Sequence, residues 1–364
     1  MEWLLLLILV PYLYLLFKIC GRLLNIRPFK PSGTAGLFVS VVIACRNEEK
    51  LISPIIDDIL SQEYNPDYFE LIIVDDNSTD RSYQIARGYN NIKNLTVLKN
   101  KGAGKKKAIR TGVEASRGSL IVTTDADCRI NKKWLKTIVS FYQENNPDMI
   151  ICPVALENDV GVFNWFQELE FLSLQGITAG TAAEGKPVMC NGANLAFSKE
   201  VYKQHASDLH EELISGDDVF LLHNIKKESG KILWLESENA YVITRPEPSL
   251  KSFLIQRTRW TSKTGSYNDS YTIILAIVTL FTILFQLSML ILGLFNTVFL
   301  LVFFTAFFLK SIPDFLILFN RALRHKKKNL LWFFLPGELV YPFYVTVLLI
   351  CYLYTRSSYY ISRE

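Results

Sequence analysis

The sequence predicts an α/β protein in which a mainly parallel sheet, flanked by helices, is combined with transmembrane α-helices. Between residues 36 and 268, apolar β-rich runs alternate with amphipathic polar segments, as in strands joined by crossover helices. Residues 270–309 include no charged side chain. Half of the 364 residues are hydrophobic and the mean hydropathy is positive, which is unusual for a soluble protein. We therefore expect a membrane protein with one polar domain.

Net charge and cysteine usage indicate which partners, cross-links and cellular compartment are expected. The formal net charge is only +4, and the basic residues are spread over the polar middle and the loops, so nucleic acid is not an expected partner. The six cysteines form no CxxC pair and no zinc-ligand spacing. This pattern argues against a disulfide framework and a structural metal site, and it favours a reducing cytoplasm for the polar domain.

The first apolar segment, Trp3 to Ile19, is about long enough to cross a bilayer. A signal peptide is the alternative, but Glu2 precedes the segment instead of a basic cluster, and no small-residue cleavage site follows Cys20. Residues 1–21 are therefore predicted to be a retained transmembrane anchor. Because Lys and Arg tend to stay cytoplasmic, the polar domain is expected in the cytoplasm on account of Arg22, Arg27 and Lys30.

The C-terminal region, residues 270–356, is expected to hold about three further spans. The uncharged stretch is long enough for two helices joined by a tight turn near residues 293–296. The basic loop that follows is again expected in the cytoplasm. The last apolar stretch contains Pro336 and Pro342, so its early part is predicted to be interfacial or bent before a span begins near Leu339. The prediction is a multi-pass protein of the cell membrane with four spans.

Acidic and polar residues follow several of the predicted strands. The apolar runs LFVSVVIAC, FELIIVDD and SLIVTTDAD lead into Cys45–Glu48, Asp75–Asp76 and Asp125–Asp127. In open α/β sheets, ligands bind beyond the carboxyl ends of the strands. The three loops are therefore predicted to face one crevice.

These acidic stations, with Asp217–Asp218 in ISGDDVFLL and Gln256–Trp260 in QRTRW, resemble glycosyltransferase family 2 over about residues 38–266. The resemblance implies a Rossmann-like GT-A domain over residues 36–268 and an inverting reaction with a nucleotide-sugar donor, UDP being the expected nucleotide. The D,D,D,QxxRW pattern is similar to that of membrane-bound polysaccharide synthases and ceramide glucosyltransferase. The family usually has Glu-Asp where this chain has Asp217–Asp218.

Asp125 and Asp127 are the candidate donor-binding and metal-binding residues. Spaced carboxylates on a short loop can hold Mg²⁺ or Mn²⁺, which neutralises a diphosphate leaving group. Both acids are expected in the turn beyond the apolar strand, where they can serve one site. A lone DxD favours two solvated loop acids, but the preceding apolar strand and the other acidic stations favour a functional role.

Two further donor contacts are expected. Asp75 and Asp76 either cap the next helix or, as the resemblance implies, place one carboxylate at the nucleotide base or ribose; the sequence does not choose between them. The loop KGAGKKK lacks the spacing of a Walker loop, but glycine amides and cations can cradle phosphate. Lys105 is the expected donor contact of this loop, and its other lysines are expected on the surface.

Asp218 is the candidate catalytic base. Inverting transfer needs one ionised carboxylate beside the incoming hydroxyl, on the face opposite the departing diphosphate. The resemblance implies this role for the second acid of the station. Capping of a helix N-terminus by adjacent acids is the alternative, and it applies at least to Asp217.

The QRTRW segment and one loop are expected at the acceptor. Gln256, Arg259 and Trp260 lie at i, i+3 and i+4, which is one face of a helix. The resemblance implies that Gln256 and Trp260 shape the acceptor site and that Arg259 stabilises the diphosphate. The alternative is an interfacial helix whose arginines meet lipid headgroups. Asn191 and Gly192 are also expected near the acceptor, although turn geometry explains them equally well.

The expected reaction transfers a sugar to a lipid, lipid-linked or glycan acceptor at the membrane. A processive synthase, similar to those of cellulose, hyaluronan or poly-N-acetylglucosamine, is the alternative within the same class. Four spans without an intramembrane series of charges make a narrow basis for a polysaccharide channel, which favours a lipid or lipid-linked acceptor. An alternative of another class is a catalytically silent scaffold that binds a nucleotide sugar, against which the retained carboxylates argue.

Overall fold

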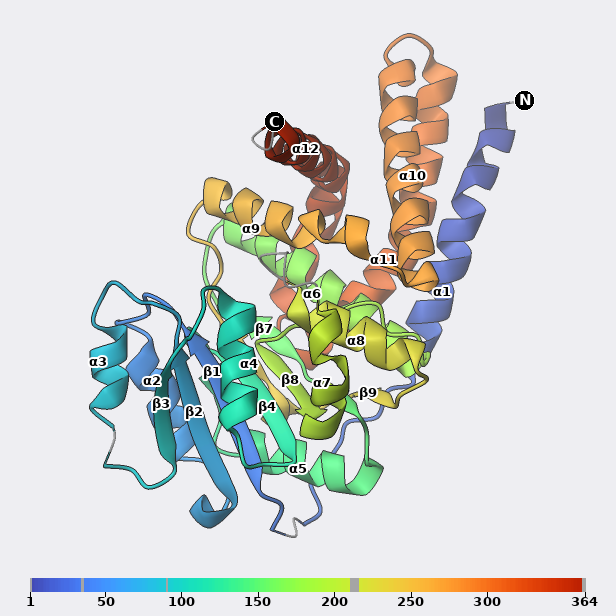
Figure 1. The fold of residues 1–364 in the computed structure, drawn as a ribbon. Coiled ribbons are helices and arrows are strands. Elements are labelled where there is room, and N and C mark those ends of the chain that lie inside the picture. The colour runs from blue at the N-terminus through green and yellow to red at the C-terminus, as the bar shows by residue number, and fades with distance from the viewer. Residues whose placement is uncertain (1, 34–35, 90, 210–215, 362–364) are drawn as a thin grey trace. The chain divides into compact units, whose positions relative to one another are not determined.

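The computed structural model describes residues 2–33, 36–89, 91–209 and 216–361 (Figure 1). The chain forms two compact units, each assembled from separate segments. The sheet unit comprises residues 26–158 and 185–245. The helical unit comprises residues 1–25, 159–184 and 246–364. The division of the chain into domains at 1–21, 36–268 and 270–356 stays a prediction.

The sheet unit is built on a seven-stranded sheet with the order β3-β2-β1-β4-β8-β6-β9 (Figure 1). Neighbours from β3 to β4 pair in parallel, whereas β8 runs antiparallel to both β4 and β6. The predicted α/β class with a mainly parallel sheet is therefore confirmed. The strands are Val39–Cys45 (β1), Phe69–Asp75 (β2), Leu95–Lys99 (β3), Leu120–Asp125 (β4), Met149–Ile151 (β6), Asn194–Ser198 (β8) and Ile232–Trp234 (β9).

A second, three-stranded sheet has the order β5-β10-β7. It consists of Arg129–Ile130 (β5), Val154–Leu156 (β7) and Val242–Thr244 (β10). Strand β5 follows the Asp125–Asp127 turn closely, and β10 pairs with β5. The second sheet therefore brings β10, which is distant in sequence, close to that turn.

Helices connect the strands of the sheet unit. Strands β1, β2 and β4 are almost wholly buried, which explains why their sequences are continuous apolar runs and do not alternate. Gly112 lets one helix approach the sheet, since a Cβ there would lie 2.4 Å from Cγ1 of Val42. The helices are Ile52–Leu60 (α2), Ser82–Arg87 (α3), Lys105–Ala115 (α4), Trp134–Asn145 (α5), Lys199–His205 (α7) and Asp217–Lys227 (α8), with short 3₁₀ turns at Pro66–Tyr68, Ala206–Asp208 and Glu238–Ala240.

The helical unit contains four stretches that are long and apolar enough to cross a membrane: 2–24, 270–293, 297–324 and 328–354. The predicted hairpin is present, since α10 ends at Gly293 and α11 begins at Thr297. Asn296 caps the start of α11, because its side chain accepts a hydrogen bond from the Val298 amide. The helices of this unit are Glu2–Leu9 (η1, 3₁₀), Val10–Leu24 (α1), Val162–Ala183 (α6), Leu250–Ser262 (α9), Thr264–Ser266 (η5, 3₁₀), Ser270–Gly293 (α10), Thr297–Arg324 (α11), Lys328–Phe333 (η6, 3₁₀) and Phe334–Ile361 (α12).

The last apolar stretch differs from its prediction. The helix α12 begins at Phe334, not near Leu339, and continues through Pro342. Pro336 lies in the first turn of the helix. Backbone amides there have no intrahelical acceptor, so a proline, which lacks the amide hydrogen, is tolerated. The irregular part is the 3₁₀ turn η6 that precedes the helix.

Helix α6 carries two glycines, Gly176 and Gly180, at an i, i+4 spacing typical of close helix packing in membranes. A Cβ on Gly176 would lie 2.3 Å from Cγ2 of Ile317 in α11. A Cβ on Gly180 would lie 2.5 Å from Cγ2 of Ile19 in α1. The two small residues thus allow α6 to contact both apolar helices.

A paired set of three charged side chains lies inside α11 and α12, contrary to the expectation of spans without a series of charges. The ammonium of Lys310 in α11 is 2.6 Å from Oδ2 of Asp314 and also pairs with Glu338 in α12. The hydroxyl of Tyr12 in α1 donates to Oδ1 of Asp314 at 2.6 Å. Mutual pairing offsets part of the cost of burying these charges. An average of hydropathy over a long window does not reveal such a small set of paired charges.

Candidate active site

The polar ends of β1, β2 and β4 lie at one edge of the sheet. The register pairs Cys45 of β1 with Asp75 of β2, and Ala44 of β1 with Asp125 of β4. Since these three strands are parallel, the loops that leave them emerge side by side (Figure 1). The structure thus brings together the first three sets of residues that the strand pattern singled out.

Asp125 and Lys105 form an ion pair at this edge. Lys105 is the first residue of α4 and follows Gly104, whose φ of +98° is a conformation that favours glycine. The Lys105 Nζ is 2.5 Å from Oδ1 of Asp125. Burial opposes the charge on Lys105, but the Asp125 carboxylate outweighs that effect, so the pKa of Lys105 is raised. The loop lysine and the first acid of the DxD sequence therefore act as one charged unit.

Asp127 lies in the turn beyond β4, whereas Asp125 is the last residue of the strand and not part of the turn in which both acids were expected. Its Oδ2 accepts a hydrogen bond from the Thr244 hydroxyl at 3.1 Å. Burial and the nearby Asp125 charge raise the pKa of Asp127. Thr244 ends β10, more than a hundred residues further along the chain, and no local pattern in the sequence predicts its contact with the turn.

Glu48 is a third carboxylate of this region, and sequence reasoning named it only as part of the loop after β1. Burial, and then the charges of Asp127 and Asp125, raise its pKa to about 7. Its backbone amide donates to the Ser82 hydroxyl at 2.7 Å, which holds the loop to the start of α3. The mutual repulsion of these acids marks a place where added positive charge is stabilising.

The carboxylates fit a divalent cation that takes further ligands from the donor. Carboxylate oxygens are the ligands that Mg²⁺ and Mn²⁺ prefer, and Mg²⁺ is often held by one or two carboxylates plus substrate phosphates. Within the described residues, no three His, Cys, Asp or Glu side chains converge closely enough to hold an ion on their own. Asp125 and Asp127 could therefore hold such a cation only together with ligands from a bound molecule.

Asp75 and Asp76, which the sequence did not distinguish, have different surroundings. Both carboxylate oxygens of Asp76 accept from the Gly104 amide, at 2.9 and 3.0 Å, and Oδ1 also accepts from the Asn100 side chain at 2.7 Å. Asp76 therefore fixes the loop that carries Lys105. Asp75 has a buried Oδ1 without a hydrogen-bond partner in the described part of the chain, so this oxygen can accept from a ligand.

Asp218 lies in the first turn of α8, directly after Asp217. Its Oδ1 accepts from the Val219 amide at 2.8 Å and its Oδ2 from the Gly192 amide at 3.0 Å. These two bonds orient the carboxylate. Burial and the adjacent Asp218 charge raise the pKa of Asp217.

A pocket in the sheet unit is lined by both of these acids. Its polar lining brings together several residues that the sequence singled out, and its floor is apolar, with Leu195 and Leu221. Thr123 orients the pocket wall by donating from its hydroxyl to the Gly192 carbonyl at 2.8 Å. The polar lining is formed by Lys105, Thr123, Gly192, Asp217 and Asp218.

Asn191 and its neighbour Asn194 are explained by turn and core geometry. The Asn191 side chain accepts from the Ala193 amide at 3.0 Å. Asn194 is buried, and it accepts from the Trp134 indole at 3.0 Å and donates to the carbonyls of Pro153 and Ala240. Asn191 shapes the turn that presents the Gly192 amide to Asp218, whereas Asn194 ties β8 to the surrounding elements.

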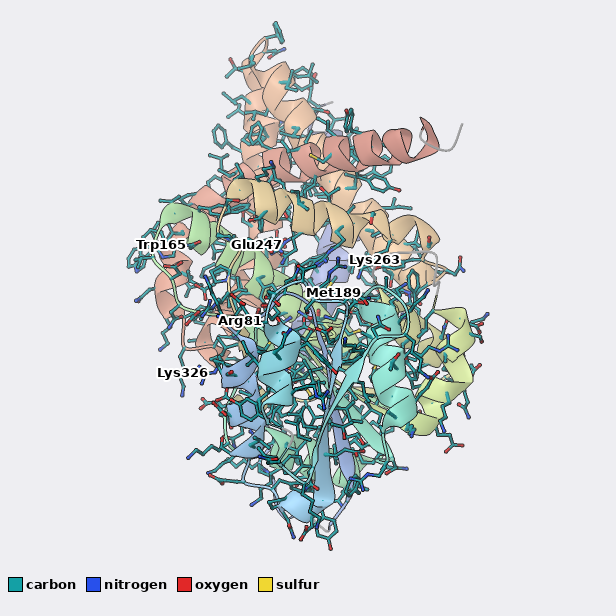
Figure 2. All side chains as sticks on the ribbon, turned by 60° about the vertical axis from the view of Figure 1, so that its left-hand side comes forward. Arg81, Trp165, Met189, Glu247, Lys263 and Lys326 are labelled. Carbon is teal, nitrogen blue, oxygen red and sulfur yellow. The ribbon has the colours of Figure 1, made fainter. Side chains whose placement is uncertain are left out.

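The QRTRW segment forms part of α9 in the helical unit, so its predicted helical conformation is present. Gln256 and Trp260 are half-buried, and Gln256 donates to Oε1 of Glu247 at 2.6 Å, a residue labelled in Figure 2. Arg259 is exposed, whereas Arg257 is only 4% exposed. Periodicity had placed Gln256, Arg259 and Trp260 on one face, and it missed the buried arginine between them.

Comparisons with known proteins show which sequences and folds this chain is similar to. Residues 40–206 match the family model for glycosyl transferase family 2. The chain is 31% identical over 125 residues to the poly(ribitol-phosphate) beta-N-acetylglucosaminyltransferase TarS of Staphylococcus aureus, over 34% of this chain and 22% of that protein. It is 28% identical over 125 residues to the beta-monoglucosyldiacylglycerol synthase of a Nostoc species, over 33% of this chain and 27% of that protein. The match thus spans about a quarter of each relative.

Among solved structures, the mannosyltransferase PcManGT of Pyrobaculum calidifontis, in complex with GDP-Man and Mn²⁺, has a similar fold. The TM-score is 0.58 at 18% sequence identity, and the similarity covers 94% of this chain and 99% of that chain. At this identity the likeness establishes the fold alone. Residues 40–206 thus match the glycosyl transferase family 2 model, and the fold of the chain is similar to that of this solved glycosyltransferase.

Proposed function

We propose that the protein is an inverting glycosyltransferase that moves a sugar from a nucleotide donor, with UDP as the expected nucleotide, to a hydroxyl of a lipid or lipid-linked acceptor. The observation that carries the proposal is the Asp218 carboxylate. Two backbone amides orient it beside a pocket that also contains Lys105. A fixed carboxylate and a cation within one pocket suit attack by a hydroxyl and departure of an anion.

The donor half of the reaction rests on the residues at the strand ends. In this proposal Lys105 offers its charge to the donor phosphates, and Asp125 and Asp127 share a divalent cation with them. The ion pair of Lys105 with Asp125 supports a common site for these residues. A bound Mg²⁺ or Mn²⁺ supplies positive charge that stabilises the departing diphosphate. The unpartnered Oδ1 of Asp75 is an acceptor for an N–H or O–H of the nucleoside.

The acceptor half assigns the base to Asp218. One carboxylate oxygen takes the proton of the acceptor hydroxyl as that oxygen attacks the anomeric carbon. The new C–O bond forms on one face while the bond to the diphosphate breaks on the other, which inverts the anomeric configuration. The Gly192 and Val219 amides hold the carboxylate during this transfer.

A lipid or lipid-linked acceptor is supported by the helical unit. Its four long apolar helices give the protein access to membrane-dissolved molecules. A relative bears the name beta-monoglucosyldiacylglycerol synthase, which denotes a sugar on a glycerolipid. Gln256 and Trp260 of α9 are proposed acceptor contacts, and Arg259 is proposed to stabilise the diphosphate.

The test is transfer by purified protein in native-lipid nanodiscs, with Mn²⁺ or Mg²⁺ and a panel of radiolabelled UDP-sugars. We expect label in a discrete lipid-extractable product. Asp218→Asn keeps the side-chain shape but removes the base, so the transfer rate is expected to fall by roughly 10² to 10⁴. A polydisperse product of high molecular mass would instead identify a processive synthase. Sugar binding without turnover in the parent protein would identify a silent scaffold.

A further inference from the structure

Arg257, the buried arginine of QRTRW, takes part in a network that joins three helices of the helical unit. Its Nε and one terminal nitrogen donate to the two oxygens of Glu170 in α6, at 2.9 and 2.6 Å. The Tyr344 hydroxyl of α12 donates to the same carboxylate at 3.1 Å. Arg257 and Glu170 are both buried, so this is a fork-to-fork ion pair shielded from solvent.

The same guanidinium touches both motif side chains assigned to the acceptor. Its other terminal nitrogen donates to the side-chain oxygen of Gln256, whose amide nitrogen donates in turn to Glu247. These two bonds determine which way the Gln256 amide faces. The guanidinium carbon lies 4.2 Å from the centroid of the Trp260 ring and 4.5 Å from that of the Phe253 ring. Arg257 therefore contacts the Trp260 indole as well as the Gln256 amide.

We propose that Arg257, Glu170 and Tyr344 are positioning residues that hold Gln256 and Trp260 in the orientation required for acceptor binding. The inference rests on the proposed function, because it assigns those two side chains to the acceptor. A planar guanidinium can bind Glu170 through two atoms, keep a third for Gln256, and stack on Trp260 at the same time. The single charge of a lysine cannot reproduce these contacts.

A stabilising role alone explains the network less well. A buried ion pair contributes little net stability compared with apolar residues of similar volume, because both charges lose their hydration. The carboxylate of Glu170 also accepts a hydrogen bond from Tyr344. The apolar helix α12, which carries Tyr344, is thereby connected through Glu170 to the QRTRW segment. Unlike apolar packing, this charged network fixes the orientation of Gln256 and Trp260.

The experiment compares Glu170→Gln, Arg257→Lys and Tyr344→Phe with the parent protein. Glu184→Gln is the matched control, since Glu184, the C-cap residue of α6, also has a buried side chain paired with a cation, Lys18, and with a tyrosine, Tyr271. Kinetics are measured in nanodiscs with diacylglycerol as the titrated acceptor and UDP-glucose as donor. We expect the acceptor KM of the three network variants to rise on the order of tenfold, with the donor KM unchanged. The control is expected to keep both values.

Two additions separate positioning from stability. The double variant Glu170→Gln with Arg257→Met removes both charges, so its thermal midpoint is expected to recover relative to Glu170→Gln alone. Its acceptor KM is expected to stay high, because neither Gln256 nor Trp260 regains its partner. Recovery of both quantities in the double variant, or equal changes in the donor and acceptor KM, would show that the network is only structural.

A readout without turnover keeps the inference separate from the proposed function. In protein labelled with 5-fluorotryptophan, the Trp260 ¹⁹F signal is assigned with Trp260→Phe. We expect Tyr344→Phe and Arg257→Lys to shift this signal, and Glu184→Gln to leave it in place. If the parent transfers no sugar to diacylglycerol, the proposed function fails for this acceptor while the ¹⁹F shifts still decide the positioning role. An unshifted Trp260 signal in both network variants overturns the inference.

Discussion

Neighbouring acids in this chain have different roles because their backbone positions differ by one residue. Asp75 ends β2, where one of its oxygens lies in the interior without a partner. Asp76 has left the strand, and it binds the Gly104 amide that precedes Lys105. A one-residue step reverses the side-chain direction along a strand, so adjacent carboxylates reach different surroundings. The two would respond differently to substitution, Asp76 through the Lys105 loop and Asp75 through the ligand.

Glu48 gives a pH prediction. Its pKa is raised in the folded protein to about 7 from an ordinary value of 4.5, so the folded state binds more protons between those values. The free energy of unfolding is therefore expected to decrease as pH rises from about 4.5 to 7. In Glu48→Gln this decrease is smaller, by on the order of 2 kcal/mol after allowance for partial exposure. Denaturant titrations in EDTA at several pH values measure it.

The control for this prediction is Glu114→Gln, which changes an exposed carboxylate of α4 that forms a surface ion pair with Arg110. Its stability curve is expected to follow that of the parent protein. A Glu48→Gln curve parallel to the parent curve over the same pH interval would mean that Glu48 titrates normally, and the crowding of carboxylates at the strand ends would then lack the inferred effect.

At the scale of elements, the helical unit depends on close approach at the α6 glycines. A Cβ on Gly180 would lie 2.9 Å from the Ile19 backbone oxygen, which cannot move aside as a side chain can. Gly180→Ala is therefore expected to destabilise the protein by about 1–3 kcal/mol, since α1 and α6 must separate. Thermal unfolding in detergent, followed by helical circular dichroism, gives the change.

Gly21 provides the matched control within α1. A Cβ there meets no atom within 4 Å, so Gly21→Ala adds only helix propensity and is expected to be neutral or to stabilise by up to about 1 kcal/mol. Equal losses in the two variants would contradict the packing argument. The sequence contains the spacing of Gly176 and Gly180, but only the positions of Ile19 and Ile317 show that both glycines are needed.

At the scale of the whole molecule, the four apolar helices are consistent with membrane association, and the charge pattern predicts the orientation. We expect the loop at Lys326, labelled in Figure 2, to face the cytoplasm and the turn at Phe295 to face outside. In a cysteine-free background, Phe295→Cys is expected to react with an impermeant maleimide in intact cells. Lys326→Cys is expected to react only after lysis.

Both residues are exposed in the structure, so a difference in labelling reports the membrane barrier. Labelling of Lys326→Cys before lysis, with protection of Phe295→Cys, would reverse the orientation and place the sheet unit outside the cell. Such a result would remove the cytoplasmic pool of nucleotide sugars as the donor source. It would leave the fold unchanged.

Much of the fold could be predicted because its signals are local. The strands β1, β2 and β4 are apolar runs that end in acids, and the α10–α11 hairpin is a long uncharged stretch with a turn near Gly293. The beginning of α12 was predicted too late, since Pro336 is tolerated in a first helical turn. The charges of α11 and α12 were overlooked because a hydropathy average conceals a few paired ions.

The sequence by itself determined the fold class, the number of apolar helices and the acids at the strand ends, because periodicity and strand termini are properties of short segments. Only the tertiary structure decided which acid supports the Lys105 loop, that Thr244 contacts Asp127, and that Arg257 and not Arg259 is buried against Glu170. Each of these depends on partners far apart along the chain. Such partners meet only when helices and strands pack, and burial then determines which charges must be paired.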